Sequence, residues 1–318
     1  MMKGYLLCAL TAFAFSFAFL LALIPLLKKL GAGQYVLSYV KEHQSKGGTP
    51  TFGGLAFIPA AVLAALLFAT EKDRTFAVVL VIGVAYLLVG FLDDFLKKKR
   101  RDNLGLTAWQ KIVFQAVIAV FAGVYCYHTG KTEVAIPFLW KKFDLGIGII
   151  PLGAFVFLAT VNGVNLTDGL DGLAAGVCAP FFLTLGLTVF LAGEAGALAT
   201  VSFALTGALL AYLLFNGPKA SVFMGDTGSL SLGGFAAALC LFSGNARLLP
   251  VVGLAFVVSV ISVLLQVIYY KATGGKRIFK MAPLHHHFQE SGFSESKISY
   301  AYSTGTLLLG LLTIVSIL

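Results

Sequence analysis

The chain has 318 residues, of which 58% are hydrophobic and only 12% are charged, and its formal net charge is +9. Ordinary soluble domains carry about twice that share of charged residues. The composition therefore excludes a soluble globular protein and indicates an integral membrane protein. Membrane topology and anionic lipid account for the positive charge, so no nucleic acid partner is needed to explain it.

Uncharged stretches of membrane-spanning length recur along the whole chain. About 20 apolar residues cross the hydrocarbon layer as a helix, and continuous apolar runs favour helices over the alternating strands of a barrel. We therefore predict an all-α polytopic membrane protein in which residues 1–318 form a single domain. Ten transmembrane helices are expected, at about residues 5–27, 52–70, 75–92, 107–127, 148–167, 172–192, 196–215, 228–244, 248–270 and 298–317.

The distribution of basic residues orients these spans. Most of the 23 lysines and arginines fall in the loops that follow the odd-numbered spans. Because cytoplasmic loops carry an excess of these residues, we expect the odd-numbered loops in the cytoplasm and both termini outside. The run from Lys97 to Arg101 is interpreted first as such a topology anchor, and second as an attraction for lipid phosphate. On the other face, residues 128–148 alternate polar and apolar side chains, which predicts a small hairpin.

Polar residues of the predicted cytoplasmic face gather in five loops. In chain order the loops read KEHQSKGGTPTFGG, LDDFLKKKRRDN, NGVNLTDGLDG, FNGPKASVFMGDTGS and KRIFKMAPLHHHFQESG. They hold five aspartates that lie within a residue or two of a predicted span boundary: Asp93, Asp94, Asp168, Asp171 and Asp226. Ionisable residues at membrane depth are energetically expensive and are candidates for function.

Helix capping is the alternative explanation for these aspartates. Asp168, Asp171 and Asp226 lie near predicted helix starts, where carboxylates serve as N-caps. Asp93 and Asp94 come at the end of a predicted span, where the helix dipole disfavours an anion. Capping therefore does not explain the Asp93–Asp94 pair.

The residue types in these loops favour a magnesium and diphosphate site. Clustered carboxylates repel one another unless a cation joins them, and Mg²⁺ binds one or two carboxylates together with substrate phosphates. Glycine-rich turns before helix starts expose N–H groups to phosphate oxygens, and Lys41 and Lys46 add positive charge. Such a site serves phosphoryl transfer. A secondary transporter, the alternative class, is expected to place its ionisable groups near the membrane midplane instead.

Five motifs, in order, resemble the polyprenyl-phosphate N-acetylhexosamine-1-phosphate transferase superfamily. They are KGGTPTFGG, GFLDD, NGVNLTDGLDGL, FNGPKASVFMGDTGSL and APLHHHF. Within the superfamily the chain is most similar, over nearly its whole length, to the phospho-N-acetylmuramoyl-pentapeptide transferases of the bacterial cell membrane. The resemblance implies transfer of phospho-MurNAc-pentapeptide from UDP-MurNAc-pentapeptide to undecaprenyl phosphate, which gives lipid I and UMP at the cytoplasmic face. A relative that uses UDP-GlcNAc is the alternative, because its diphosphate machinery would look alike.

The resemblance also implies roles for individual residues, Mg²⁺ as the cofactor and a homodimer in the membrane lipid. Asp93, Asp94 and Asp226 match the family's essential carboxylates, with Asp226 as the Mg²⁺ ligand. The positions that match nucleotide- and substrate-binding residues are Lys46, Thr51, Asn162, Asn165, Asp168, Gly169, Asp171, Asn216, Phe223, His285, His286 and His287. One departure occurs at Gln289, where the family usually has a glutamate after HHHF.

Two mechanisms stay open from the sequence. In a direct attack, one carboxylate of the pair, with Asp93 preferred, takes the proton of undecaprenyl phosphate. The lipid phosphate then attacks the sugar-linked β-phosphorus of the UDP-sugar. In a two-step route an aspartate is the nucleophile and forms a phospho-enzyme.

Overall fold

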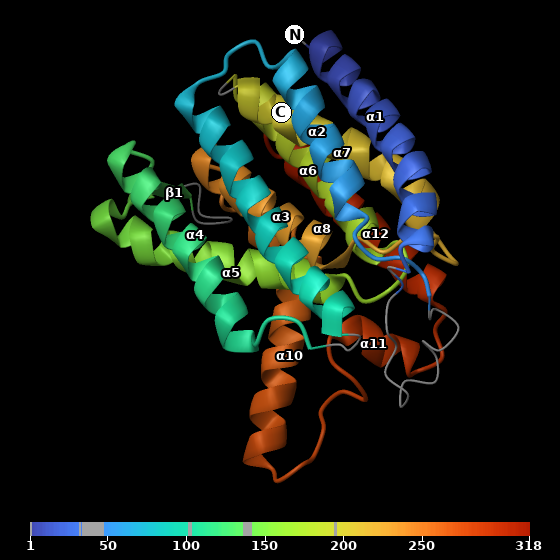
Figure 1. Ribbon diagram of the computed structural model, residues 1–318. Helices are drawn as coiled ribbons and strands as arrows, with labels where there is room; N and C mark the ends of the chain where they lie inside the picture. Colours follow the sequence, from blue (N-terminus) through green and yellow to red (C-terminus); the bar gives the residue numbers. More distant parts are fainter. Residues whose placement is uncertain (1, 32, 34–47, 101–103, 136–141, 194–195) are drawn as a thin grey trace.

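The computed structural model of the chain describes residues 2–31, 33, 48–100, 104–135, 142–193 and 196–318 (Figure 1). Its elements in chain order are α1 (Met2–Lys29), α2 (Gly54–Phe68), α3 (Arg74–Arg100), α4 (Ala108–His128), β1 (Glu133–Ala135), β2 (Lys142–Asp144), the short 3-10 helix η2 (Gly146–Gly148), α5 (Ile149–Thr167), α6 (Leu173–Leu191), α7 (Gly196–Asn216), α8 (Gly225–Phe242), α9 (Leu248–Val251), α10 (Leu254–Ala272), α11 (Leu284–Gln289) and α12 (Glu295–Val315).

The predicted all-α polytopic membrane architecture is confirmed. In the described ranges, eight helices are long and apolar enough to cross a membrane: α1, α3, α4, α5 with η2, α6, α7, α10 and α12. The other two predicted spans correspond to α2, which has only 15 residues, and to α8, whose first two turns carry Asp226, Thr227, Ser229 and Ser231. The total of ten spans therefore stays a prediction, as does the side of the membrane on which the termini lie.

Two predicted spans differ from the helices observed by more than about three residues or by a break. The third span was expected to end at residue 92, but α3 continues to Arg100, so Asp93 and Asp94 lie about two turns inside a helix. Lysine and arginine are good helix formers, and cations at the end of a helix are favoured by its dipole. The ninth predicted span, 248–270, is divided into α9 and α10, with Val252 and Gly253 between them.

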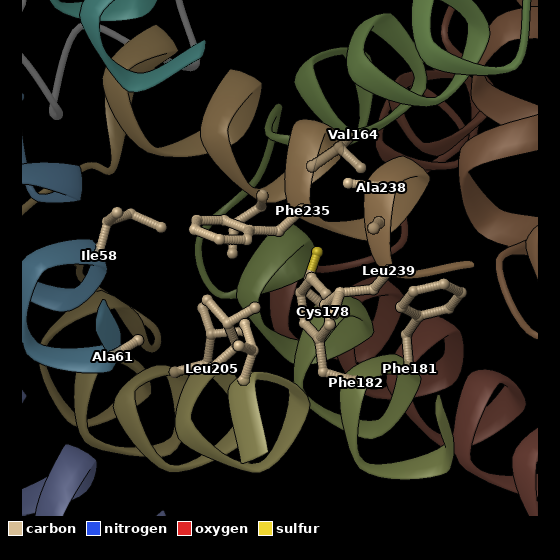
Figure 2. Packing of buried hydrophobic residues seen from close by; sticks show 14 of the residues in the cluster. Ile58, Ala61, Val164, Cys178, Phe181, Phe182, Leu205, Phe235, Ala238 and Leu239 are labelled. Atoms are coloured by element: carbon tan, nitrogen blue, oxygen red, sulfur yellow. The ribbon is translucent and has the colours of Figure 1, made fainter. Parts of the chain in front are cut away.

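The bundle is organised around α8. This helix packs against α3, α5, α2 and α6, and from Thr227 to Phe242 every residue is buried. Figure 2 shows its side chain Phe235 directed toward Ile58 of α2, and its side chain Leu239 beside Phe181 and Phe182 of α6, with Leu205 of α7 nearby. This apolar packing fixes α8 among its neighbours and so fixes the position of its first turn.

Glycines permit the closest helix contacts around the start of α8. A Cβ atom on Gly90 of α3 would collide with the backbone of Asp226, and one on Gly54 of α2 would collide with the backbone of Gly228. In membrane bundles, small residues let helix backbones approach one another in this way. The Gly90 contact brings the next turn of α3, which carries Asp93 and Asp94, against α8.

The two ends of the bundle differ in structure. The predicted hairpin is confirmed, since β1 pairs antiparallel with β2 and Glu133 lies opposite Asp144; residues 136–141 lie outside the described residues. In Figure 1 the marks for both termini lie at the top of the view, while α11 and the end of α3 lie lower. The described parts of the five motifs lie toward that second end.

Candidate active site

Three carboxylates from two helices meet where α3 packs against the start of α8. Asp93, Asp94 and Asp226 each offer one oxygen atom, and these atoms lie within 4.8 Å of one another. Asp93 is 2% exposed and Asp94 is 4% exposed. The structure thus brings together the three predicted carboxylates, although more than 100 residues of chain separate the pair from Asp226.

Asp94 is anchored to the first turn of α8. Its Oδ2 atom accepts hydrogen bonds from the backbone N–H of Thr227, at 2.9 Å, and from the Thr227 hydroxyl, at 2.7 Å. The first N–H groups of a helix have no partner inside the helix, so Asp94 satisfies one of them from a neighbouring helix. A Cβ atom on Gly225 would approach both Asp94 Oδ2 and Thr51 Oγ1, which places Thr51 beside this carboxylate.

Asp93 holds the chain segment that enters α4. Its Oδ1 atom accepts a hydrogen bond of 2.7 Å from the backbone N–H of Leu106. The helix then begins with a capping box, in which Thr107 and Gln110 bond to each other's backbone N–H groups. This defined start of α4 directs Lys111, in its first turn, toward the carboxylates.

Two lysines face the three carboxylates. Lys97 Nζ lies 2.6 Å from Asp93 Oδ2, 2.9 Å from Asp226 Oδ2 and 3.8 Å from Asp94 Oδ1, and Lys111 Nζ lies 2.7 Å from Asp226 Oδ2. The sequence analysis did not place either lysine in the site. The spacing of Lys97, three and four residues after the aspartates, is a signal for contact on one helix face. For Lys111 the sequence carries no comparable signal.

Asparagines of α5 complete this side of the site. Asn165 Nδ2 donates to Asp226 Oδ1 at 2.7 Å and to the Ser229 hydroxyl at 2.8 Å. Asn162, one turn earlier, donates instead to the side-chain oxygen of the buried Gln115 on α4, at 2.7 Å. Asn165 is therefore a direct partner of the carboxylates, whereas Asn162 lies in the polar contact between α4 and α5.

The capping explanation for the remaining aspartates is not supported by their positions. Asp168 follows the end of α5 rather than preceding a helix. Asp171 Oδ2 accepts from the backbone N–H of Ala220 at 3.0 Å, and the N-cap of α6 is Gly172, in a left-handed conformation. Asp226 lies in the first turn of α8, but its oxygens face Lys97, Lys111 and Asn165.

Asp168 belongs electrostatically to the same site. Burial, and then the negative charges of Asp226, Asp94 and Asp171, raise the pKa of the Asp168 carboxyl well above its ordinary value. Both a buried environment and nearby like charges disfavour the ionised form of an acid. A cation or a hydrogen-bonding ligand is therefore needed to hold Asp168 in its charged form.

Asn216 and Phe223 have different surroundings. Asn216 is 3% exposed; its side-chain oxygen accepts from the backbone N–H of Gly172, and its amide nitrogen donates to the backbone oxygen of Val222. It therefore joins the loop before α6 to the loop before α8. The backbone of Phe223 bonds to Pro50 and Gly53, which ties that loop to the segment before α2.

The three histidines of α11 each have a different environment. His285 is fully buried, and a Cβ atom on Gly169 would collide with Nε2 of His285 and approach Nε2 of His286. His287 Nδ1 accepts from the backbone N–H of Lys280 at 3.1 Å. Burial, and then the charge of His286, lowers the pKa of His285 to about 3, so this side chain is neutral at physiological pH.

Gln289, the departure from the family pattern, connects α11 to the rest of the site. Its oxygen lies 3.0 Å from His286 Nδ1, and its amide nitrogen donates to Glu295 Oε1 at 3.1 Å. Glu295 Oε2 in turn accepts from the backbone N–H of Asp171 at 3.4 Å. Of the predicted substrate-binding residues, Lys46 lies outside the described residues, as does Lys41.

The oxygen atoms of the three carboxylates suit a hard divalent cation such as Mg²⁺. Three carboxylate oxygens within 4.8 Å of one another, two of them on buried residues, supply the oxygen ligands that Mg²⁺ prefers. Asn165 and the Thr227 hydroxyl add neutral polar groups next to Asp226 and Asp94. The structure thus places a cluster of acidic side chains at one end of a bundle of helices that are long and apolar enough to cross a membrane.

Comparison with known proteins defines the class and then the family. Residues 76–244 match the glycosyl transferase family 4, and this region includes all three carboxylates. The chain is 41% identical to the phospho-N-acetylmuramoyl-pentapeptide-transferase of Thermoanaerobacter sp. (strain X514), over 97% of each chain. It is 42% identical to the protein of that name from Clostridium botulinum (strain Eklund 17B / Type B), over 94% of this chain and 92% of the relative. The chain therefore belongs to the phospho-N-acetylmuramoyl-pentapeptide transferases, a family of phosphoglycosyl transferases.

Proposed function

We propose that the chain transfers phospho-MurNAc-pentapeptide from UDP-MurNAc-pentapeptide to undecaprenyl phosphate at the site around Asp93, Asp94 and Asp226. The products are lipid I and UMP, and the reaction is the first membrane step of peptidoglycan synthesis. Family membership over nearly the whole chain supports this activity. The observation that carries the assignment of the site is the convergence of three carboxylates and two lysines at one end of a membrane helix bundle.

Mg²⁺ is the proposed cofactor, with Asp226 as its principal ligand and Asp93 and Asp94 within reach. When bound, the ion neutralises charge on the diphosphate and on the leaving UMP. Lys111 and Asn165 hold opposite oxygens of the Asp226 carboxylate. Thr227 holds Asp94, and Leu106 holds Asp93. The carboxylates are thus oriented before any substrate arrives.

Asp93 is the proposed base of a direct attack. Its Oδ1 atom is occupied by the Leu106 N–H, while its Oδ2 atom contacts the Lys97 ammonium. Asp94 Oδ2 already accepts two hydrogen bonds from Thr227. Asp93 Oδ2 is therefore the oxygen better placed to accept the proton of the lipid phosphate. Recovery of a phosphorylated aspartate from protein incubated with the UDP-sugar alone would contradict direct attack.

The remaining predicted residues are proposed to bind the nucleotide sugar. Thr51 and Asp168 lie near the carboxylates, and the ring of Phe223 is partly exposed and suited to stacking on uracil. Asn216 and Asp171 order the loops around it through their contacts with Val222 and Ala220. Asn162 joins α5 to α4 through its contact with Gln115. His285 and His286 of α11 lie against Gly169, and the three histidines of α11 are proposed as donors to sugar or phosphate.

We also propose the finer topology of the chain. Ten spans with both termini outside place this site on the cytoplasmic face of the bacterial cell membrane. The excess of basic residues in the odd-numbered loops supports this orientation, and in Figure 1 both termini lie at the end opposite α11. A homodimer within the membrane is proposed from the family resemblance.

The activity can be tested with purified protein, undecaprenyl phosphate and Mg²⁺, offering UDP-MurNAc-pentapeptide and UDP-GlcNAc in parallel. We expect UMP release and a lipid-linked product only with the muramoyl substrate. UMP release with UDP-GlcNAc alone would contradict the proposed substrate while leaving the phosphoglycosyl chemistry in place. Reactions without undecaprenyl phosphate serve as the control for hydrolysis of the nucleotide sugar.

A further inference from the structure

Lys97 occupies the space between the three carboxylates. Its ammonium nitrogen lies 2.6 Å from Asp93, 2.9 Å from Asp226 and 3.8 Å from Asp94. By contrast, the contact of Lys111 with this cluster is with Asp226 alone. Among the described residues, Lys97 is therefore the group that brings positive charge to all three members of the cluster at once.

The position of Lys97 overlaps with the one that suits a divalent cation. An ion held by oxygens of Asp226 and either of the other two aspartates would lie among the same atoms that surround Lys97 Nζ. Mg²⁺ requires oxygen ligands at about 2.0–2.1 Å and an octahedral shell. An ammonium group within hydrogen-bond distance of the same oxygens would fill part of that shell and repel the ion. The two cations therefore exclude each other.

The Lys97 side chain also has a route out of the cluster. It is 32% exposed, whereas the carboxylates of Asp93 and Asp94 are 3% and 4% exposed. It stands in the last turn of α3, on a flexible four-carbon stem. Its release would leave the carboxylates in place, because Leu106, Thr227 and Asn165 hold each of them independently.

From these contacts we propose that Lys97 is a resident counter-ion that a divalent cation displaces, and that the displaced ammonium then binds phosphate oxygens of the substrates. Burying carboxylates without a cation is costly, so Lys97 stabilises the metal-free site. When the divalent ion enters, the positive charge of Lys97 becomes available at the open side of the site. The proposal rests on the proposed metal-dependent function and adds a second role to its machinery.

Metal affinity distinguishes displacement from simple charge repulsion. The test is Mn²⁺ binding by electron paramagnetic resonance, without substrates, to the wild type and to Lys97→Met, Lys111→Met and Lys99→Met. Lys99 is exposed two residues further along α3, so its variant makes the same change in charge away from the cluster. We expect Lys97→Met to bind Mn²⁺ at least about tenfold more tightly, Lys111→Met to show a smaller gain, and Lys99→Met to stay within about twofold. Equal gains for Lys97→Met and Lys111→Met, or no gain for Lys97→Met, would overturn the proposal.

A second measurement on the unmodified protein keeps the proposal testable if Lys97→Met fails to fold. Mild acetylation followed by mass spectrometry reports how accessible each lysine is. We expect Mn²⁺ to increase acetylation of Lys97 at least about threefold while Lys99 stays unchanged. Unchanged or reduced acetylation of Lys97 would contradict displacement. Neither readout depends on sugar transfer, so failure of the proposed activity would be seen separately in the UMP assay.

Discussion

The two halves of α8 show how one helix serves two purposes. Its first turns carry Asp226, Thr227 and Ser229, whose side chains bond to groups from α3, α4 and α5. Its second half is apolar, with Phe235 and Leu239 packed among side chains of α2, α6 and α7 (Figure 2). Both halves are almost completely buried, yet only the first contains a carboxylate.

The apolar half of α8 therefore stabilises the bundle, whereas the polar half carries the groups that can do chemistry. The apolar half is held by close packing, which is the main attraction between helices in a membrane. The polar half is held by hydrogen bonds and ion pairs that leave carboxylate oxygens directed at one another. Substitutions in the two halves should therefore change different measurements.

The largest expected effect comes from the polar half. Asp226→Asn keeps the shape of the side chain but removes the negative charge shared by Lys97 and Lys111. We expect the turnover rate to fall by about 1000-fold or more, the scale seen when a key charge-stabilising group is lost. The thermal unfolding midpoint in detergent should change by only a few degrees. Retention of metal-dependent turnover would contradict the role of Asp226.

The contact between the polar half and α3 can be tested through Gly90. In Gly90→Ala the new methyl group would collide with the Asp226 backbone, so α3 and α8 must separate and the carboxylates must move apart. We expect a fall in turnover of about 100-fold, because small displacements of catalytic groups have effects of this size. Gly305→Ala on α12 is the matched control, since a Cβ atom there meets no other group within 4 Å. Equal activity of the two variants would show that the close contact is not needed.

The apolar half should respond in the opposite way. Leu239→Ala removes a side chain that is 1% exposed and leaves a cavity beside α6. We expect a loss of about 2 kcal/mol in the free energy of unfolding, at the low end for such substitutions, because lipid is as apolar as the bundle interior. The turnover rate of the folded protein should stay within about twofold of the wild type. A large loss of turnover without loss of stability would contradict the separation between the halves.

The smallest effect, when counted per pH unit, concerns the buried His285. Its pKa of about 3 in the folded protein is below the ordinary value of about 6.5 in an unfolded chain. The unfolded state therefore binds the extra proton first, and stability is full above about pH 6.5 and declines as the pH falls toward 3. The slope contributed is at most about 1.4 kcal/mol per pH unit. Thermal unfolding from pH 4 to 7 should show this slope reduced in His285→Leu, with His128→Leu as the control for loss of an imidazole at an exposed position. An unchanged slope in His285→Leu would contradict the assignment.

Much of the site was predictable because its residues occur in sequence motifs of the loops and helix ends. Alternating spans return every second loop to one side of the membrane, so Asp93, Asp94 and Asp226 were expected at one end despite their separation in the sequence. The continuation of α3 past Asp94 was not predicted, because the expected span was bounded where the uncharged stretch ends. The sequence also did not predict the partners of the carboxylates. The contacts of Lys97, Lys111 and Thr227 depend on which faces of α3, α4 and α8 meet. That geometry is set by packing at residues such as Gly90, which a pattern of apolar residues does not reveal.

The most direct test of the central claim is to locate a bound cation by diffraction. Crystals grown with Mn²⁺ and a uridine nucleotide would show the metal by its anomalous scattering. We predict a single strong peak within ligand distance of Asp226 and next to Asp93 and Asp94, with the Lys97 side chain moved out of the cluster. A peak bound by other residues, with the three carboxylates left around Lys97, would contradict the account.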